Sequence, residues 1–346
     1  MRVHVLGDAF CDVVSHGLTK LPTWGGDAKA NGVGLFAGGS ALNTAIHVRG
    51  ILSGSDHSVT LFTALGESRD DWASEVLENH LSKHDVGLKA KRVMGKSTGV
   101  CIVLSGTSDR AFVTSNGAVT EYSYEDVDVA NLAKCDHLHF GGVYALTGLV
   151  NDIPRLISEV RQMNPTITIS LDTNFDATGV WGRPWLGTVF PMIDFIKLND
   201  EEAEQVRTNN CSNPSQMKMD VVSWLAQHVR QAAIVTHGKD GAAYAFSNNP
   251  TRILRSRSLS VTAIDVVGAG DAFNAGFIAS WCTGRDGSEE RLKKAVEFAC
   301  KCGALNVMTI GACQVPVSIP RINDFEQNLT GNGQSASKRL LLSKSE

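Results

Sequence analysis

The chain has 346 residues, of which 43% are hydrophobic and 33 are glycine. A chain of this length and composition can bury a substantial core as one large α/β domain. The formal net charge is −4 and no long basic run is present, which argues against nucleic acid or an anionic membrane surface as the main partner. Because there is no apolar signal-peptide core and no apolar run of transmembrane length, the sequence predicts a cytosolic protein. The 8 cysteines are scattered, and we expect them to be buried free thiols.

Strand-like and helix-like segments alternate along the chain. Hydrophobic periodicity predicts strands at 3–6, 59–65, 136–140, 167–172, 193–198 and 232–236. It predicts helices at 41–52, 71–84, 151–163, 201–207 and 291–307. Such alternation indicates a mainly parallel sheet with helices on both faces.

Two segments interrupt this alternation, and the C-terminal segment lacks it. Residues 13–37 and 97–120 carry strand-like runs with Gly-rich turns and no helix between them, so we expect a small sheet that projects from the main domain. Over residues 327–346, Gly, Ser, Asn and Lys dominate without periodicity, so we expect a disordered tail.

The segment 265–277 carries the strongest functional signal. Leu259–Ile264 alternates like a strand, and Phe273, Phe277 and Trp281 recur at helical spacing as a buried stripe. This pattern places Gly268-Ala269-Gly270 at a strand-to-helix corner. Glycines allow a backbone to approach a ligand closely, and the free N–H groups of a first helical turn attract phosphate.

Asp271 is unexpected in this turn, because a carboxylate beside a phosphate site is repulsive unless it has another task. Accepting the proton of an attacking hydroxyl is such a task. The alternative is that Asp271 only complements the helix dipole, which is a common use of Asp in a first turn. Its place at a helix N-terminus also predicts a low pKa.

A second motif, Gly38-Gly39-Ser40-Ala41-Leu42-Asn43-Thr44-Ala45, introduces a helical stripe. Together the two segments resemble the paired signatures of the ribokinase-like (PfkB) family of small-molecule kinases, over about Met1 to Pro320. The resemblance implies a ribokinase-like kinase domain over residues 1–326, with the small sheet as a lid over the substrate. It implies transfer of the γ-phosphoryl group of ATP to a hydroxyl, with Asp271 as base and the amides of Gly268, Ala269 and Gly270 stabilising the transferred group.

The resemblance also implies residues that hold the acceptor. Asp12 would hydrogen-bond substrate hydroxyls, and Gly38, Gly39 and Asn43 would hold the sugar or nucleoside. Two plainer alternatives stay open: Asp12 as a solvated turn residue, and Asn43 as a capping residue on a surface helix.

Asn199 and Glu202 follow the predicted strand at 193–198, and their spacing is that of a helix capping box. The resemblance matches them to an Asn-x-x-Glu motif in which Asn199 lies near the nucleotide and Glu202 organises Mg²⁺, usually through water. Mg²⁺ suits such a site because it keeps several waters and needs only one or two carboxylates. Both interpretations can hold together.

Four further residues are matched to the nucleotide. Thr236, Gly238 and Gly241 lie in or beside a predicted tight turn, and the resemblance implies that they contact the phosphates and ribose of ATP; a plain hairpin is the alternative. Asn306 resembles a polar residue of the adenine pocket, and is otherwise one surface position on a helix.

Two positions depart from the family pattern. Val266 stands where relatives commonly carry Thr, in a loop that binds a monovalent cation in some members, so activation by K⁺ is left open. Asp176 stands where the motif Asp-x-Asn-x-Arg has its arginine, and the loss of that cation argues against an acidic sugar or a sugar phosphate as substrate. The resemblance also leaves a homodimer through the lid open.

Three functions follow in order of preference. The first is an ATP-dependent kinase that phosphorylates a hydroxymethyl group of a small neutral sugar, because residues 171–174 look more like the carbohydrate members. The second is a nucleoside kinase, because residues 39–43 also resemble some adenosine kinases. The third, a catalytically silent nucleotide-binding protein, is least favoured because Asp271 is present.

Overall fold

The computed structural model describes residues 1–54, 56–67, 71–106, 110–181, 184–284 and 287–330. Its main element is a nine-stranded sheet with the order β13-β12-β11-β10-β9-β8-β1-β4-β5. The strands are β1 (Arg2–Gly7), β4 (Ser58–Glu67), β5 (Gly87–Met94), β8 (His137–Gly141), β9 (Thr168–Asp172), β10 (Phe195–Asn199), β11 (Ala232–Thr236), β12 (Ala242–Phe246) and β13 (Leu254–Ser256). All neighbours from β5 to β11 pair in parallel, and only β12 and β13 are antiparallel. The mainly parallel sheet is therefore confirmed.

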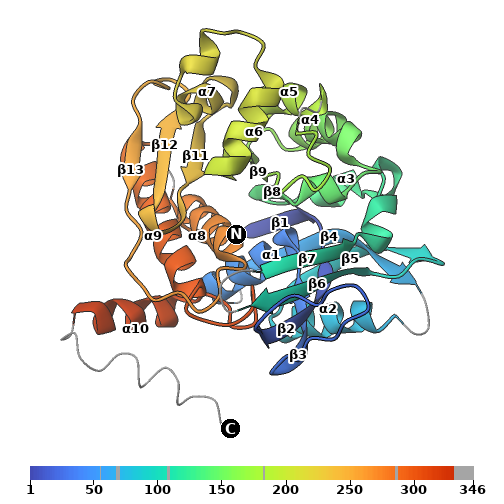
Figure 1. Ribbon diagram of the computed structural model, residues 1–346. Helices are drawn as coiled ribbons and strands as arrows, with labels where there is room; N and C mark the ends of the chain where they lie inside the picture. The colour runs from blue at the N-terminus through green and yellow to red at the C-terminus, as the bar shows by residue number, and fades with distance from the viewer. Residues whose placement is uncertain (55, 68–70, 107–109, 182–183, 285–286, 331–346) are drawn as a thin grey trace.

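Helices cover both faces of this sheet, and each face has its own apolar core (Figure 1). One core includes side chains from α1 (Ser40–Ile51), α2 (Trp72–Lys83), α8 (Ala269–Thr283), α9 (Glu289–Asn306) and α10 (Ile319–Thr330). The other includes side chains from α3 (Val129–Leu132), α4 (Ile153–Met163), α5 (Pro184–Val189), α6 (Asp200–Asn210) and α7 (Val221–His228). Strands enclosed on both faces need apolar residues at successive positions, which is why these segments appear as continuous apolar runs.

A separate four-stranded sheet lies beside the main one (Figure 1) and has the order β3-β2-β6-β7. Its strands are β2 (Phe10–Leu18), β3 (Gly32–Gly38), β6 (Gly99–Gly106) and β7 (Arg110–Ser115). The two segments that interrupt the alternation therefore form the expected small sheet. The end of the second segment is not a strand, because residues 117–121 form a 3₁₀ helix.

One predicted strand is wrong. Residues Leu259–Ile264 lie outside regular structure, since β13 ends at Ser256 and the chain then leaves the sheet. The backbone N–H of Ile264 donates instead to the carbonyl of Val307 at 2.7 Å. The alternation arises because Leu259 and Val261 pack against the core while the residues between and after them are exposed.

The C-terminal prediction needs a smaller correction. Residues 327–330 still belong to α10, and the remainder of the expected tail, 331–346, lies outside the described residues. All 8 cysteines are free thiols and five of them are buried, as expected.

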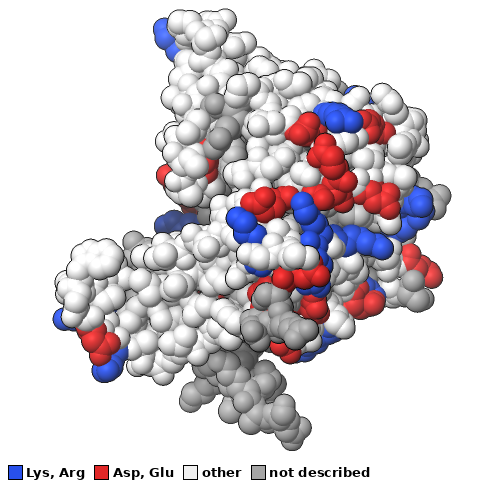
Figure 2. All heavy atoms as spheres, turned by 90° about the vertical axis from the view of Figure 1, so that its right-hand side faces the viewer, with Lys and Arg blue, Asp and Glu red and all other residues white. Residues whose placement is uncertain are grey.

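Charges of both signs are mixed on the molecular face shown in Figure 2, where Lys and Arg lie interspersed with Asp and Glu. That face therefore lacks the extended basic patch on which nucleic acid binding depends. Within the described ranges, no helix is long and apolar enough to cross a membrane.

Candidate active site

The carboxyl ends of the parallel strands meet at one edge of the main sheet. In the strand order, β4 and β5 lie on one side of β1 and β8 to β11 lie on the other. The order in which the chain adds strands to the sheet therefore reverses at β1. In open parallel sheets, ligands collect beyond the carboxyl ends at such a switch point. Polar residues lie at this edge: Asp8 after β1, Asp172 at the end of β9, Asn199 at the end of β10 and Thr236 at the end of β11. We therefore place the candidate active site here.

Asp271 lies in the first turn of α8. Gly268 precedes the helix with a φ of 75°, and a Cβ on it would lie 2.7 Å from the backbone of Ala312, so this position requires glycine. Two side chains of α1 donate to the Asp271 carboxylate, Ser40 Oγ to Oδ1 and Asn43 Nδ2 to Oδ2, both at 2.8 Å. Asn43 is buried, so the alternative of a capping residue on a surface helix is wrong. The packing of α1 against α8 thus joins the two motifs.

The protonation of Asp271 differs from the behaviour that its helix position predicts. Burial raises the pKa of Asp271 to about 6, although the hydrogen bond from Asn43 lowers it, and repulsion from Asp172 adds to the rise. The low pKa expected from the helix dipole is wrong, because removal from water outweighs the dipole. A carboxylate with this pKa is mostly ionised at neutral pH and still has affinity for a proton, which suits a general base.

Asp12 belongs to the small sheet. It lies within β2 and is partly buried, so the alternative of a solvated turn residue is wrong. A Cβ on Gly38 would lie 2.2 Å from Asp12 Oδ2, so glycine is required for the carboxylate to lie against this backbone. Burial raises the pKa of Asp12 to about 7, and repulsion from Asp271 adds to the rise. The two carboxylates therefore face one site from a strand and from a helix.

The turn between β3 and α1 is held by a further carboxylate. Gly39 has a φ of 96°, and a Cβ on it would lie 2.8 Å from the Cα of Ala9. Asp8 accepts the backbone N–H of Ala41 at 2.9 Å and so fixes the start of α1. Burial raises the pKa of Asp8 well above its usual value, and repulsion from Asp271 adds to the rise.

A buried ion pair lies beside the Gly268–Gly270 turn. Lys197 Nζ is 2.8 Å from Asp172 Oδ2, and Asn274 Nδ2 donates to the same oxygen at 2.7 Å. A Cβ on Gly270 would lie 2.8 Å from Lys197 Nζ, so the ammonium is close to the turn. The motifs do not single out Lys197, Asp172, Asn274, Ser40 or Asp8 as site residues. A lysine inside the apolar run Phe195–Leu198 is the one sequence signal that could have revealed this pair.

Asn199 and Glu202 form the capping box that their spacing predicts. Asn199 Oδ1 accepts the N–H of Glu202 at 2.8 Å, and Glu202 Oε2 accepts the N–H of Asn199 at 2.9 Å. Burial raises the pKa of Glu202 to about 7, and repulsion from Asp172 adds to the rise. The capping interpretation is confirmed, and the Glu202 carboxylate lies beside the end of β10.

The predicted hairpin is also confirmed, since β11 and β12 pair antiparallel. Thr236 pairs with Asn199 across β10 and β11, so both lie at the same edge. Gly238 has a φ of 54°, and a Cβ added to it would meet no atom within 4 Å. A Cβ added to Gly241 would lie 2.0 Å from the carbonyl oxygen of Ser256. Gly238 therefore borders open space, while Gly241 has a packing reason to be glycine.

Asn306 is not a surface residue. It is the last residue of α9 and is 1% exposed, and its Nδ2 donates to the carbonyl of Val267 at 3.0 Å. Asn306 thus ties α9 to the loop that precedes the Gly268–Gly270 turn.

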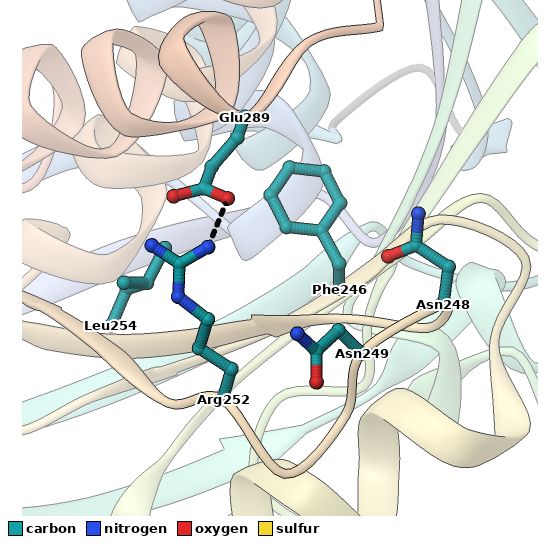
Figure 3. A pocket seen from close by; sticks show the side chains of 6 residues that line it. All are labelled: Phe246, Asn248, Asn249, Arg252, Leu254 and Glu289. Atoms are coloured by element: carbon teal, nitrogen blue, oxygen red, sulfur yellow. Dashed lines mark hydrogen bonds and ion pairs between the residues drawn. The ribbon is translucent and has the colours of Figure 1, made fainter.

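A shallow pocket lies elsewhere on the molecule (Figure 3). It is lined by Phe246, Asn248, Asn249, Arg252, Leu254 and Glu289. Arg252 and Glu289 point toward one another and form an ion pair at 2.6 Å. Glu289 is the first residue of α9 and Asn306 is the last, and a helix of this length is about 27 Å long. The pocket therefore lies about 27 Å from the hydrogen bond between Asn306 and Val267. It is therefore separate from the site at the strand ends.

Comparisons with known proteins identify the family and the fold of this chain. The family model described as pfkB family carbohydrate kinase matches residues 5–319. An ATP-dependent ribose-1-phosphate kinase of Halopiger xanaduensis is 28% identical over 92% of this chain and 96% of its own length, and the ribokinase of Schizosaccharomyces pombe is 26% identical over 94% and 97%. An Escherichia coli structure assigned as ribokinase II, in complex with ATP and Mg²⁺, has a TM-score of 0.77 at 21% identity and covers 94% of this chain and 99% of that chain. Since the family model spans most of its length, this chain belongs to the pfkB family of carbohydrate kinases.

Proposed function

We propose that this protein transfers the γ-phosphoryl group of ATP to a hydroxymethyl group of a small neutral sugar. The observation that carries the proposal is the position of Asp271 in the first turn of α8, with Ser40 and Asn43 donating to its carboxylate. A base beside an anion-binding turn is what phosphoryl transfer to a hydroxyl requires. Membership of the pfkB family supports the same reaction class.

Each group at the site has a task in this reaction. Asp271 orients the acceptor hydroxyl and takes its proton late in the transfer. The backbone N–H groups of Gly268–Gly270 stabilise charge on the transferred group, and preorganised donors of this kind often make the largest single contribution. Asp12 and Asn43 hydrogen-bond the other hydroxyls of the acceptor, which lies close to the backbone of Gly38–Gly39.

The nucleotide would lie along the ends of β10 and β11, where Asn199 pairs with Thr236 and Gly238 follows two residues later. Gly241 and Asn306 are assigned to the same nucleotide site by the family resemblance alone.

Glu202 offers a carboxylate oxygen of the type that Mg²⁺ prefers, and Mg²⁺ keeps several of its waters. In the described part of the chain no three His, Cys, Asp or Glu side chains form a metal cluster, so Glu202 would hold the ion through water together with the phosphates. When bound, Mg²⁺ neutralises charge on the phosphates.

The small sheet would act as a lid, because it carries Asp12 into a site otherwise built by the main domain. Its closure would exclude water from the acceptor and limit hydrolysis of ATP.

The acceptor is proposed to be neutral because the site is rich in carboxylates. Asp8, Asp12 and Asp271 repel one another there, and a buried anionic group without its own cation is costly. Asp176, at the position of the family's arginine, is 1% exposed and accepts the N–H of Trp181 at 2.9 Å, so it organises its own loop. A phosphorylated acceptor is the competing case, because the relatives named above include a ribose-1-phosphate kinase as well as a ribokinase.

A nucleoside kinase is the second candidate, and Phe36 favours it. Phe36 pairs directly with Asp12 across β2 and β3, so both side chains lie on one face of the small sheet. An aromatic ring beside the acceptor site is suited to stacking on a base.

The test is a comparison of ADP formation with ribose, fructose, ribose 1-phosphate, adenosine and inosine under matched conditions. We expect the highest kcat/KM for a free sugar, and the Asp271→Asn variant controls for contaminating kinases. A kcat/KM for adenosine or ribose 1-phosphate far above that of every free sugar would contradict the proposed acceptor. No ADP formation above the variant's level with any acceptor would contradict the kinase itself.

Two further expectations stay predictions. Activation by K⁺ concerns the loop that contains Val266, and activity in KCl should exceed activity in NaCl at equal ionic strength. A homodimer through the lid is supported by the row Leu35–Val13–Ile102–Val113, which crosses the small sheet on the face opposite Asp12. Leu35, Ile102 and Val113 are 50%, 41% and 59% exposed. Light scattering should show a dimer that Val113→Lys dissociates.

A further inference from the structure

Lys197 is the only lysine or arginine that is buried among the residues described by the structure. It is the central residue of the five-residue strand β10, two residues before the carboxyl end of the strand. Removing an ammonium from water is costly, so a buried lysine needs carboxylates nearby. Asp172 supplies one at 2.8 Å, and Asn274 donates to the same oxygen. Although burial lowers it, attraction to Asp172 and Glu202 raises the pKa of Lys197 above its usual value, so this side chain is charged.

The position of the ammonium indicates more than a structural ion pair. A Cβ added to Gly270 would lie only 2.8 Å from Lys197 Nζ. The positive charge of Lys197 is therefore directed at the Gly268–Gly270 turn. The same charge attracts Asp271, the proposed base, and Glu202, the proposed ligand of Mg²⁺. A cation at this point therefore acts on the proposed base and on the proposed ligand of Mg²⁺ at once.

We propose that Lys197 is a positioning residue for phosphoryl transfer: held by Asp172 and Asn274, its ammonium keeps a positive charge against the Gly268–Gly270 turn, where negative charge gathers during transfer. This inference rests on the proposed function. In the reaction the bond between the γ-phosphorus and the ADP oxygen breaks, the bond to the acceptor oxygen forms, and the hydroxyl proton passes to Asp271. Lys197 neither gives nor takes a proton, and it acts through charge and through the shape of the turn.

Four variants separate this role from a structural one. Lys197→Met removes the charge but leaves Asp172 buried without its cation. The double variant Lys197→Met with Asp172→Asn removes both charges and keeps an acceptor for Asn274, so it guards against a loss of folding. Lys197→Arg restores the charge. Arg161→Met is the matched control, because Arg161 pairs with the buried Asp194 at 2.7 Å near the other end of β10.

The first measurement is steady-state kinetics with the best acceptor of the panel described above. We expect the double variant to lose about a hundredfold in kcat, the size found when one preorganised donor is removed, with little change in KM for the acceptor. Lys197→Arg keeps the charge, so its kcat should be at least about tenfold higher than that of the double variant. Arg161→Met should lower the melting temperature and leave kcat near that of the wild type. A near-normal kcat for the double variant, or an equal loss in Arg161→Met, would overturn the inference.

The second measurement needs no acceptor. Calorimetric titration of the double variant and of the wild type with Mg-ATP and with Mg-ADP isolates the effect of the γ-phosphate. We expect affinity for Mg-ATP to fall about tenfold more than affinity for Mg-ADP, since only ATP places charge at the turn. Equal losses for the two nucleotides would overturn the inference. Should the wild type phosphorylate none of the acceptors, the proposed function would fail while this titration still decides the role of Lys197.

Discussion

Two aspartates near the ends of β10 have different surroundings. Asp194, just before the strand, is 3% exposed and accepts Arg161 at 2.7 Å, Arg230 at 3.3 Å and the backbone N–H of Ile169 at 2.8 Å. Two charged donors, Arg161 and Arg230, are therefore among the groups that hold this carboxylate, which joins α4, β9 and β10. Asp194 is a structural group whose negative charge is neutralised by the arginines that donate to it.

Asp271, close to the other end of β10, has neutral hydrogen-bond donors instead. Ser40 and Asn43 each donate to one of its oxygens, and the nearby cation Lys197 is already paired with Asp172. A carboxylate with neutral donors and like-charged neighbours keeps affinity for a proton, as its raised pKa shows. Both carboxylates are largely withdrawn from water, so what separates Asp194 from Asp271 is the charge of the side chains that donate to them.

Exchanging the two carboxylates for amides should separate activity from stability most strongly. We expect Asp271→Asn to lower kcat by about a thousandfold or more, because base and orientation are both lost, while ATP binding and the melting temperature change little. We expect Asp194→Asn to cost about 3–5 kcal/mol of unfolding free energy and to leave kcat of the folded enzyme near normal. Steady-state kinetics and urea denaturation of both variants make the comparison. A near-normal kcat for Asp271→Asn would return that residue to the helix-dipole role.

A smaller effect is expected where the site depends on a close backbone approach. In Gly38→Ala the new Cβ would fall 2.2 Å from Asp12 Oδ2, so the carboxylate must move. Displacements of this kind cost on the order of a hundredfold in kcat/KM for the acceptor. Gly32→Ala in the same strand is the control, because a Cβ there meets no atom within 4 Å. Equal kcat/KM values for the two variants would remove Asp12 from the acceptor site.

Much of the fold could be predicted because periodicity is local, whereas the site depends on contacts between distant segments. The parallel sheet and the small sheet follow from runs of a few residues each. The failed strand at Leu259–Ile264 shows the limit, since alternation arose there from packing without a partner strand. Lys197 was missed because its partner Asp172 is 25 residues away and Gly270 is further still. The raised pKa of Asp271 depends in the same way on tertiary burial.

Glu202 tests whether a capped helix start can also serve a cation. Glu202→Gln still accepts the N–H of Asn199, so the fold should stay intact. We expect the Mg²⁺ concentration for half-maximal activity to rise about three- to tenfold, because a neutral amide oxygen replaces a carboxylate. Glu201→Gln, an exposed neighbour in the same turn, should leave the Mg²⁺ titration unchanged. Superimposed titrations of the wild type and Glu202→Gln would show that Glu202 is only a cap.

The smallest expected effect concerns pH. The carboxylate of Asp271 must be ionised to accept a proton, and its pKa is about 6, so kcat/KM should fall as the pH is lowered through that value. Asp12 has a pKa of about 7, and it contributes to the same fall of kcat/KM on the acid side of the pH profile if its ionised form holds the acceptor. The charged groups that face Asp271 are Asp8, Asp12, Asp172, Lys197 and Glu202.

Removing one of the neutral donors to Asp271 should shift the acid limb of the pH profile, which is the pH range over which kcat/KM falls. Ser40→Ala deletes a hydrogen bond that lowers the pKa of Asp271, so the acid limb should shift to higher pH, by less than about one unit. Ser223→Ala, in the buried face of α7 on the other side of the sheet, is the matched control and should leave the profile in place. The measurement is kcat/KM for the acceptor between pH 5 and pH 9 at saturating Mg-ATP. Identical limbs in the wild type and Ser40→Ala would mean that the donor from α1 does not tune Asp271, and that the limb belongs to another of the carboxylates.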